Sequence, residues 1–230
     1  MEYDALVQRA RVTPAAVTSY VNKVYLWMAL SLAVTAGAAA YVAGSPEMTL
    51  WVLEHWLMML ILLLVAILLM SFGRNFLTVG ALGTVFCLFS AVEGATLGPI
   101  LTLYTTASVG IAFATSAGMF GAMALYGAVT KRDLSGMGRM LTMLLFGLII
   151  AGVVSCFWGG TMVHFGINVA GVVIFCLFTA YDMQNVIRAG LLVRDEEERS
   201  KGAIFGALAL YLDFLNLFLY LLRLLGERRD

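Results

Sequence analysis

Three acidic residues, Glu93, Asp182 and Asp213, lie inside stretches of the sequence that are otherwise apolar. Each stretch is about 20 residues long, the length that a helix needs to cross the hydrocarbon core of a membrane. An ionised side chain at that depth costs a few kcal/mol unless a partner or a water-filled cavity stabilises it. No Lys or Arg lies near the middle of any stretch, so no basic side chain is placed to neutralise these acids.

Asp182 and Asp213 form the pair with the clearest chemistry. Asp213 lies well inside the last apolar stretch, about 16 Å along a helix that rises about 1.5 Å per residue. Antiparallel packing of the last two stretches would bring Asp182 to a similar depth. Two carboxylates that share a low-dielectric site cannot both ionise cheaply, so they share a proton and titrate as a unit. Such a pair is suited to sensing protons, binding a cation or acting as an acid–base couple.

Each acid also has a purely structural interpretation. Asp213 would then only hydrogen-bond within a helix bundle, and Asp182 would reach interfacial water or pair with Arg188. Glu93 would be an interfacial acid rather than part of an outer vestibule that attracts cations. The sequence leaves these alternatives open.

Polar residues share a helical face with the two aspartates. In the last stretch, spacings of three and four place Gly202, Gly206, Ala209, Asp213, Asn216 and Tyr220 on one stripe. Small residues allow helices to approach closely, so this stretch is predicted to be a central helix. Asn168, Thr179 and Asn185 share a stripe with Asp182 in the preceding stretch. The candidate pore-lining residues are therefore Glu93, Asn168, Thr179, Asn185 and Asn216.

The composition excludes a soluble protein. The chain is 62% hydrophobic and 12% charged, against about 45–50% and about 25% for soluble domains, and its mean hydropathy is +0.94. Its net charge of zero gives no basic surface for nucleic acid. Its three cysteines lie in apolar runs without a CxxC pair, so they indicate neither a disulfide framework nor a metal site. The lipid bilayer is the expected partner.

Seven apolar stretches predict an all-α membrane protein, a bundle of seven transmembrane helices. Their continuous runs of Leu, Ala, Met and Gly lack the alternation of barrel strands. The stretches are 22–44, 50–70, 77–98, 107–129, 140–158, 162–187 and 202–225. We expect residues 1–21 to be a cytoplasmic N-terminal segment, 22–225 the transmembrane domain and 226–230 a short C-terminal tail. The acidic run 195–198 is expected to be a solvated loop.

The distribution of Lys and Arg predicts the orientation. Basic residues flank the start of the chain and the even-numbered turns, and the connections around 45–49, 99–106 and 159–161 have none. The N-terminus is therefore expected in the cytoplasm. Seven crossings would place Arg223, Arg228 and Arg229 outside, against this rule. The alternative is a re-entrant last segment that returns the C-terminus to the inside.

Most enzyme classes lack their signatures here. The chain has no HExxH or GxSxG motif, and we expect no cofactor and no enzymatic activity. One alternative is an intramembrane aspartyl protease, because Tyr181 and Asp182 match half of its signature. The other half requires Gly-x-Gly-Asp, where this chain has 210–213 (LYLD), and the later Pro-Ala-Leu element is missing.

Four segments together resemble a known family. They are 178–184 (FTAYDMQ), 209–216 (ALYLDFLN), 119–127 (MFGAMALYG) and 130–136 (TKRDLSG). They are similar to motifs of the Bax inhibitor family, also called the transmembrane Bax-inhibitor-motif family, and specifically to its bacterial inner-membrane branch. The resemblance extends over nearly the whole chain from Tyr20 onward.

The resemblance implies a seven-helix bundle with the last helix surrounded by the other six, in a bacterial inner membrane. It also implies a slow, pH-dependent calcium leak in which Asp182 and Asp213 act as sensor and gate and bind calcium transiently. An arginine near the cytoplasmic end of the second span holds the family's pair shut, and Arg74 is the candidate for this latch. Calcium and protons would then be the partners. Bacterial members are also associated with a membrane-bound quality-control protease, which implies a second role without ion flux.

The residues and the resemblance lead to one hypothesis. At neutral pH the aspartate pair shares a proton and closes the cytoplasmic side of a pore. When both acids ionise, repulsion parts the helices and leaves a negative site for a divalent cation. When both are protonated, the site loses its affinity for calcium, which prefers carboxylate and carbonyl oxygens. The alternative is a non-conducting regulatory protein in which the aspartates are structural.

Overall fold

The computed structural model describes residues 14–192 and 195–229, and in these ranges the chain forms eight helices and no strand. The helices are α2 (Pro14–Ala43), α3 (Pro46–Glu54), α4 (Trp56–Gly73), α5 (Val79–Thr102), α6 (Thr106–Val129), α7 (Met137–Trp158), α8 (Thr161–Leu192) and α9 (Glu196–Leu225). All except α3 are long and apolar enough to cross a membrane. The predicted all-α fold class with seven spans is confirmed.

The second stretch differs from its predicted bounds, because 50–70 is not one continuous helix. Residues 46–54 form the separate short helix α3, in which Ser45 caps the first turn and Pro46 occupies the first position. The chain then turns at His55, whose backbone leaves the helical region. The His55 ring stacks on Trp51 at 4.6 Å and its Nδ1 lies 2.8 Å from the Trp51 carbonyl oxygen. These contacts hold the turn that starts α4.

The acidic run 195–198 is also different from the expected loop. Asp195 is the N-cap of α9, and its carboxylate accepts a hydrogen bond from the backbone N–H of Glu198 (2.9 Å). The three glutamates that follow form the first helical turn. Negative side chains are favourable there because the N-terminal end of a helix dipole is positive. The last helix therefore begins six residues before the predicted stretch.

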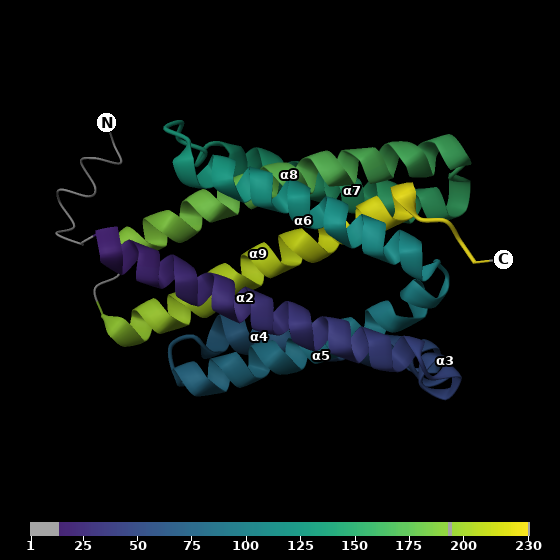
Figure 1. The fold of residues 1–230 in the computed structure, drawn as a ribbon, viewed down its shortest axis with the longest axis horizontal. Helices are drawn as coiled ribbons and strands as arrows, with labels where there is room; N and C mark the ends of the chain where they lie inside the picture. The colour runs from purple at the N-terminus through teal and green to yellow at the C-terminus, as the bar shows by residue number, and fades with distance from the viewer. Residues whose placement is uncertain (1–13, 193–194, 230) are drawn as a thin grey trace.

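Two groups of helices lie on either side of α9 (Figure 1). One group consists of α2, α3, α4 and α5, and the other of α6, α7 and α8. Helix α9 packs against α2 and α5 in the first group and against α6 and α8 in the second. Apart from α9, the groups meet mainly where α2 contacts α8. The last helix therefore joins the two groups.

The burial of each helix confirms that α9 is central. In its most apolar window 56% of the residues are buried, against 17–39% for the other spans. The lowest value belongs to α4 and α7, which pack on the outer side of α5 and α8. The last helix is thus central, but four spans contact it closely rather than six.

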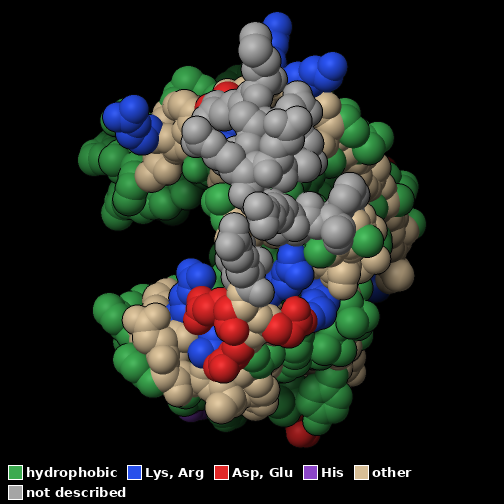
Figure 2. Space-filling view, turned by 90° about the vertical axis from the view of Figure 1, so that its left-hand side faces the viewer, with side chains coloured by type: hydrophobic (Ala, Val, Ile, Leu, Met, Phe, Trp, Pro, Cys, Tyr) green, Lys and Arg blue, Asp and Glu red, His purple; other side chains and the backbone are tan. Residues whose placement is uncertain are grey.

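One side of the bundle is open between the two groups. Figure 2, which looks at the end where α2 begins, shows a deep notch there. On α9, the partly exposed residues Phe205, Leu212 and Asn216 share one stripe, opposite Phe214, which packs against rings of α6. This stripe therefore faces the notch.

Close helix contacts within each group depend on glycine. A Cβ atom at Gly94 of α5 would collide with the backbone of Thr35 in α2, and one at Gly127 of α6 would collide with the backbone of Ala180 in α8. Small residues at such points let membrane helices approach closely. The two groups are therefore tightly packed internally.

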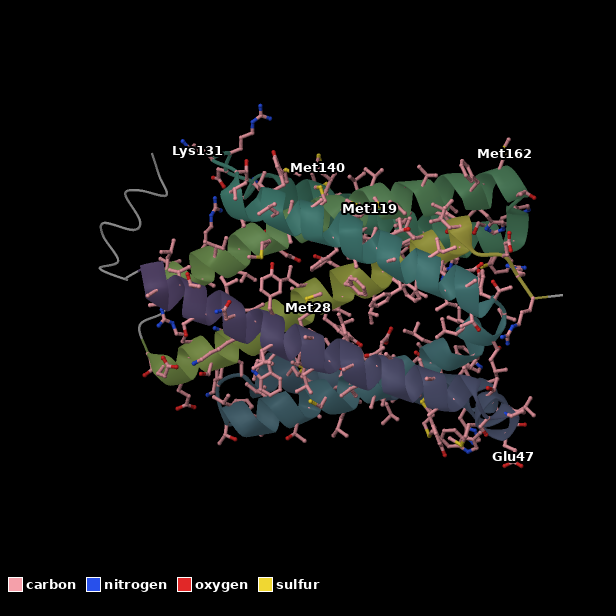
Figure 3. The ribbon with its side chains drawn as sticks, viewed as in Figure 1. Met28, Glu47, Met119, Lys131, Met140 and Met162 are labelled. Atoms are coloured by element: carbon pink, nitrogen blue, oxygen red, sulfur yellow. The ribbon has the colours of Figure 1, made fainter. Side chains whose placement is uncertain are left out.

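The C-terminal residues lie at the opposite end of the bundle from the start of α2 (Figure 1). Helix α9 runs without interruption, and the residues after it pair with the α5–α6 connection. The N–H of Thr105 donates to the Glu227 carbonyl (3.1 Å) and the N–H of Arg229 to the Leu103 carbonyl (2.9 Å). Figure 3 shows Glu47 and Lys131 marking these two ends. In the described residues the last segment crosses once and is not re-entrant.

Candidate functional site

Helices α8 and α9 bring the two aspartates together. They pack along much of their length, because Gly206 of α9 faces Val186 and Gly171 of α8 faces the ring of Tyr220. Between these two contacts, the carboxyl groups of Asp182 and Asp213 lie close enough to hydrogen-bond to each other. The structure therefore places Asp182 and Asp213 at similar depths and side by side, as the sequence predicted.

The two aspartates differ in their surroundings. Asp213 is 4% exposed, and its Oδ2 atom is buried with no hydrogen-bond partner in the described part of the chain. Asp182 is partly exposed, and its Oδ1 accepts a hydrogen bond from Asn185 Nδ2 (3.5 Å). A carboxylate can only accept hydrogen bonds, so two adjacent carboxyl groups bond to each other only when one carries a proton. The pair can therefore hold a shared proton.

Neither aspartate has a basic partner among residues 14–192 and 195–229. Arg188, the partner that the sequence offered to Asp182, hydrogen-bonds instead to Asp133 and Ser135 in the α6–α7 connection. Pairing of Asp182 with Arg188 is thus not what the structure shows. Within these ranges the two acids therefore have no opposite charge beside them. Acids placed in this way inside a membrane are costly in free energy and usually have a function.

Arg74 lies at the end of the bundle and not beside the aspartates. Its guanidinium is 3.6 Å from a carboxylate oxygen of Glu198 and lies over the ring of Phe205, 5.5 Å from the centroid. Phe205 precedes Asp213 by eight residues, which is about 12 Å along the helix. In this conformation Arg74 contacts the first turns of α9.

The other candidate pore-lining residues mostly bond to their own helices. Thr179 is fully buried and donates to the Phe175 carbonyl (2.8 Å), and Asn216 donates to the Leu212 carbonyl (2.8 Å). Asn185 donates to Asp182 (3.5 Å), and Asn168 is partly exposed on α8. Glu93 is partly exposed on α5, on the face whose Phe86 and Phe89 rings meet Tyr211, and so lies on the opposite side of α9 from Asp213.

The described residues contain no group of three or more His, Cys, Asp or Glu placed to hold a metal ion. Calcium usually takes six to eight oxygen ligands. A calcium ion at Asp182 and Asp213 would therefore depend on carbonyl or water oxygens as well.

The sequence did not single out Gln184, which fastens the α6–α7 connection to α8. Its Oε1 accepts from the backbone N–H of Leu134 (2.8 Å), and its Nε2 donates to the carbonyl of Arg132 (2.8 Å). Its residue type could have identified it, because an amide side chain two residues after Asp182, in a largely apolar helix, needs hydrogen-bond partners.

Arg188 reinforces the same attachment. Its hydrogen bonds to Asp133, with those from Ser135, hold the pKa of the Asp133 carboxyl well below its usual range. Asp133 is outside the membrane-spanning segments. The connection beside the aspartate pair is therefore held to α8 by both side-chain amide and ionic contacts.

The sequence also overlooked the polar groups around Tyr211. The hydroxyl oxygens of Tyr211 and Thr35 are 2.7 Å apart, and Thr35 donates to the Ser90 carbonyl (3.0 Å). Tyr211 stands two residues before Asp213 within a motif that the sequence did identify. Its partner Thr35 is one of several small hydroxyl residues in a long apolar helix and carries little signal.

Comparisons with known proteins identify relatives. A family model described as "Inhibitor of apoptosis-promoting Bax1" matches residues 17–230. Inner membrane protein YbhL of Escherichia coli is 41% identical over 220 residues, 94% of each chain. A protein of Deinococcus radiodurans is 37% identical over 214 residues, 93% of this chain and 92% of that one. With seven candidate spans, these matches establish an integral, multi-pass membrane protein.

Proposed function

The chain belongs to the Bax inhibitor family, and on that premise we propose that it is a pH-sensitive calcium leak gated by Asp182 and Asp213. The observation that supports this proposal is the pair of acids without a basic partner. Asp213 lies beside Asp182, and its buried Oδ2 has no hydrogen-bond partner among the described residues. We further propose that it lies in a bacterial inner membrane with the N-terminal end in the cytoplasm. The gathering of Lys and Arg at that end supports this orientation (Figure 2).

The gate follows from the protonation of the pair. With one shared proton, Asp182 and Asp213 hydrogen-bond and hold α8 against α9. When that proton leaves, two negative charges face each other in a low-dielectric site and repel. The group α6–α8 then moves away from α9, and the open carboxylates attract calcium. With both acids protonated, the site has no charge to attract a divalent cation.

A second candidate is a non-conducting regulator of a membrane-bound quality-control protease. The α6–α7 connection favours it, because Lys131 and Arg132 are exposed at the tip that Figure 3 shows projecting from the bundle. In that case Asp182 and Asp213 would act only through stability. Activity would require the protease.

Calcium entry into dye-loaded liposomes distinguishes the two. Purified protein is reconstituted and flux is measured from about pH 6 to 8. The leak predicts flux that rises with pH in the parent and loses this dependence in Asp182→Asn and Asp213→Asn. Glu47→Gln, which removes an exposed acid at the other end, should behave like the parent.

Two results would reject the leak. One is no flux above that of empty liposomes from protein shown to be folded, which would favour the regulator. The other is an Asp213→Asn variant that conducts with unchanged pH dependence.

A further inference from the structure

Tyr211 anchors α9 on the face opposite Asp213. Its side chain is fully buried, and the rings of Phe86 and Phe89 in α5 meet it edge-on at 5.6 and 6.1 Å. Its hydroxyl reaches Thr35 in α2 at 2.7 Å. Three helices of the bundle therefore converge on one phenol group.

The direction of these hydrogen bonds can be assigned. Thr35 has a single hydroxyl hydrogen, which it donates to the Ser90 carbonyl (3.0 Å). Tyr211 must then donate its own hydrogen to Thr35. The hydroxyl of Ser90 donates to the Phe86 carbonyl (2.8 Å). The Tyr211 oxygen is left with acceptor capacity and without a free hydrogen.

Glu93 faces this network without a partner. It is partly exposed and lies one turn beyond Phe89 and Ser90, on the face of α5 that meets Tyr211. Among the described residues its carboxyl group has no hydrogen bond or ion pair. An ionised Glu93 could only accept, and the hydrogens of Tyr211 and Thr35 are already used. A protonated Glu93 could donate to the Tyr211 oxygen.

A second open position lies in the same interface. Ser31 is 0% exposed, and its hydroxyl has no hydrogen-bond partner among residues 14–192 and 195–229; it precedes Thr35 by one turn on the same face of α2. Buried polar groups without partners are rare and call for an explanation. A protonated carboxyl on Glu93, with one hydrogen to donate, suits the acceptor on Tyr211.

We propose that Glu93 is a second proton-binding site, whose proton completes a hydrogen-bond chain from Glu93 through Tyr211 and Thr35 to the Ser90 carbonyl. The chain ties α5, α9 and α2 together on the side away from Asp182. It holds α9 to the first group of helices whether or not the aspartate pair is closed. Loss of this proton at high pH removes the tie and leaves an unpaired charge inside the bundle.

Few other titratable groups lie on the elements packed against α5. Helix α4 has none, and the remaining groups are Tyr20, Lys23, Tyr25 and Tyr41 on α2, Glu47 and Glu54 on α3, and, at this depth of α9, Tyr211 and Asp213. Asp213 points to α8, and both α3 glutamates are exposed. Tyr211 is thus the partner available to Glu93.

The test measures protonation and stability, not calcium flux, so its failure is distinct from failure of the leak. Thermal unfolding of the full chain in liposomes is followed from about pH 6 to 9, together with infrared absorption of protonated carboxyl groups. The unfolding temperature of the parent should fall as pH rises, because the folded state holds a proton that the unfolded state releases. Glu93→Gln should lose a carboxyl band and flatten that slope, also in an Asp182→Asn/Asp213→Asn background.

Glu54→Gln is the matched control, since Glu54 is an exposed acid on neighbouring α3, and it should match the parent. If Glu93→Gln does not fold, Tyr211→Phe supplies the test, because loss of the hydroxyl should shift the Glu93 carboxyl band. An unchanged pH slope in folded Glu93→Gln would overturn the proposal. So would an infrared spectrum of Tyr211→Phe identical to that of the parent in the carboxyl region.

Discussion

Tyr211 and Asp213 lie two residues apart in the middle of α9 and point to opposite sides of it. The hydroxyl of Tyr211 is held by Thr35 and packed between two phenylalanine rings. Asp213 faces another acid, Asp182, and one of its oxygens has no hydrogen-bond partner within the described part of the chain. One face of the helix is therefore held by hydroxyl hydrogen bonds that do not involve the aspartate pair, and the other depends on the proton that the pair shares. A gate needs both, a fixed face to move against and a face whose attraction can be switched.

The largest expected effect is on the switched face. Asp213→Asn should abolish the pH dependence of calcium flux, because an amide cannot ionise and repulsion with Asp182 cannot develop. The measurement is liposome flux across about pH 6 to 8, where the parent should change several-fold. A folded variant whose flux still follows pH as in the parent would assign the switch to another group.

On the fixed face, Gly94→Ala should lower the free energy of unfolding by about 1–3 kcal/mol, since overpacking at a tight contact is costly. Its new methyl group would meet the backbone of Thr35, which cannot yield easily. Gly206→Ala, which meets the side chains of Val186 and Val24 at 3.0 Å and 3.4 Å, should cost less. Denaturant unfolding of both variants measures the difference, and a reversed order would mean that the α2–α5 contact is the looser one.

Tyr211→Phe should destabilise the protein by about 1 kcal/mol, the net contribution of a typical hydrogen bond. The ring packing stays, but Thr35 loses its donor. The pH dependence of calcium flux should persist, because Asp182 and Asp213 are untouched. Tyr220→Phe is the control on the same helix. If Tyr211→Phe loses the pH dependence while remaining folded, the two faces are not independent.

The smallest effect is expected at the Arg188–Asp133 pair. The pKa of Asp133 is lowered by Arg188 and Ser135, so the ion pair stabilises the protein above the ordinary pKa of an aspartate and loses this effect as pH falls. Arg188→Gln should therefore reduce stability slightly at neutral pH, and the difference from the parent should vanish in acid. Unfolding temperatures at several pH values measure this. A difference that grows in acid would contradict the assignment.

The fold was largely predictable, because helix count and burial follow from apolar length. Seven apolar stretches without basic residues in their centres can cross a membrane only as helices or as strands of a closed barrel, and their length and composition favour helices. The bounds were less predictable, since Ser45 and Asp195 cap helices that hydropathy alone does not detect. A polar residue at the end of an apolar stretch can begin a helix as well as end one.

The aspartate pair was predictable because acids are rare in apolar stretches and helices adjacent in sequence tend to pack together. The Tyr211 network was not, since Thr35 and Ser90 come from helices distant in sequence and hydroxyl groups are common in membrane helices. Arg74 shows the same limit, because its contacts with Glu198 and Phe205 depend on where α9 begins. Long-range packing determines which polar groups meet.

The separation of the two helix groups as a function of pH tests most directly whether the proton shared by Asp182 and Asp213 holds the groups together. Spin labels at Asn75 and Lys131, both exposed and in different groups, would be measured by double electron–electron resonance in liposomes, with the three native cysteines replaced by serine. If the shared proton holds the groups together, the distance should increase between about pH 6 and 8 as that proton leaves, and it should stay constant in Asp213→Asn. A parent distance that does not change, or one that changes equally in Asp213→Asn, would contradict it.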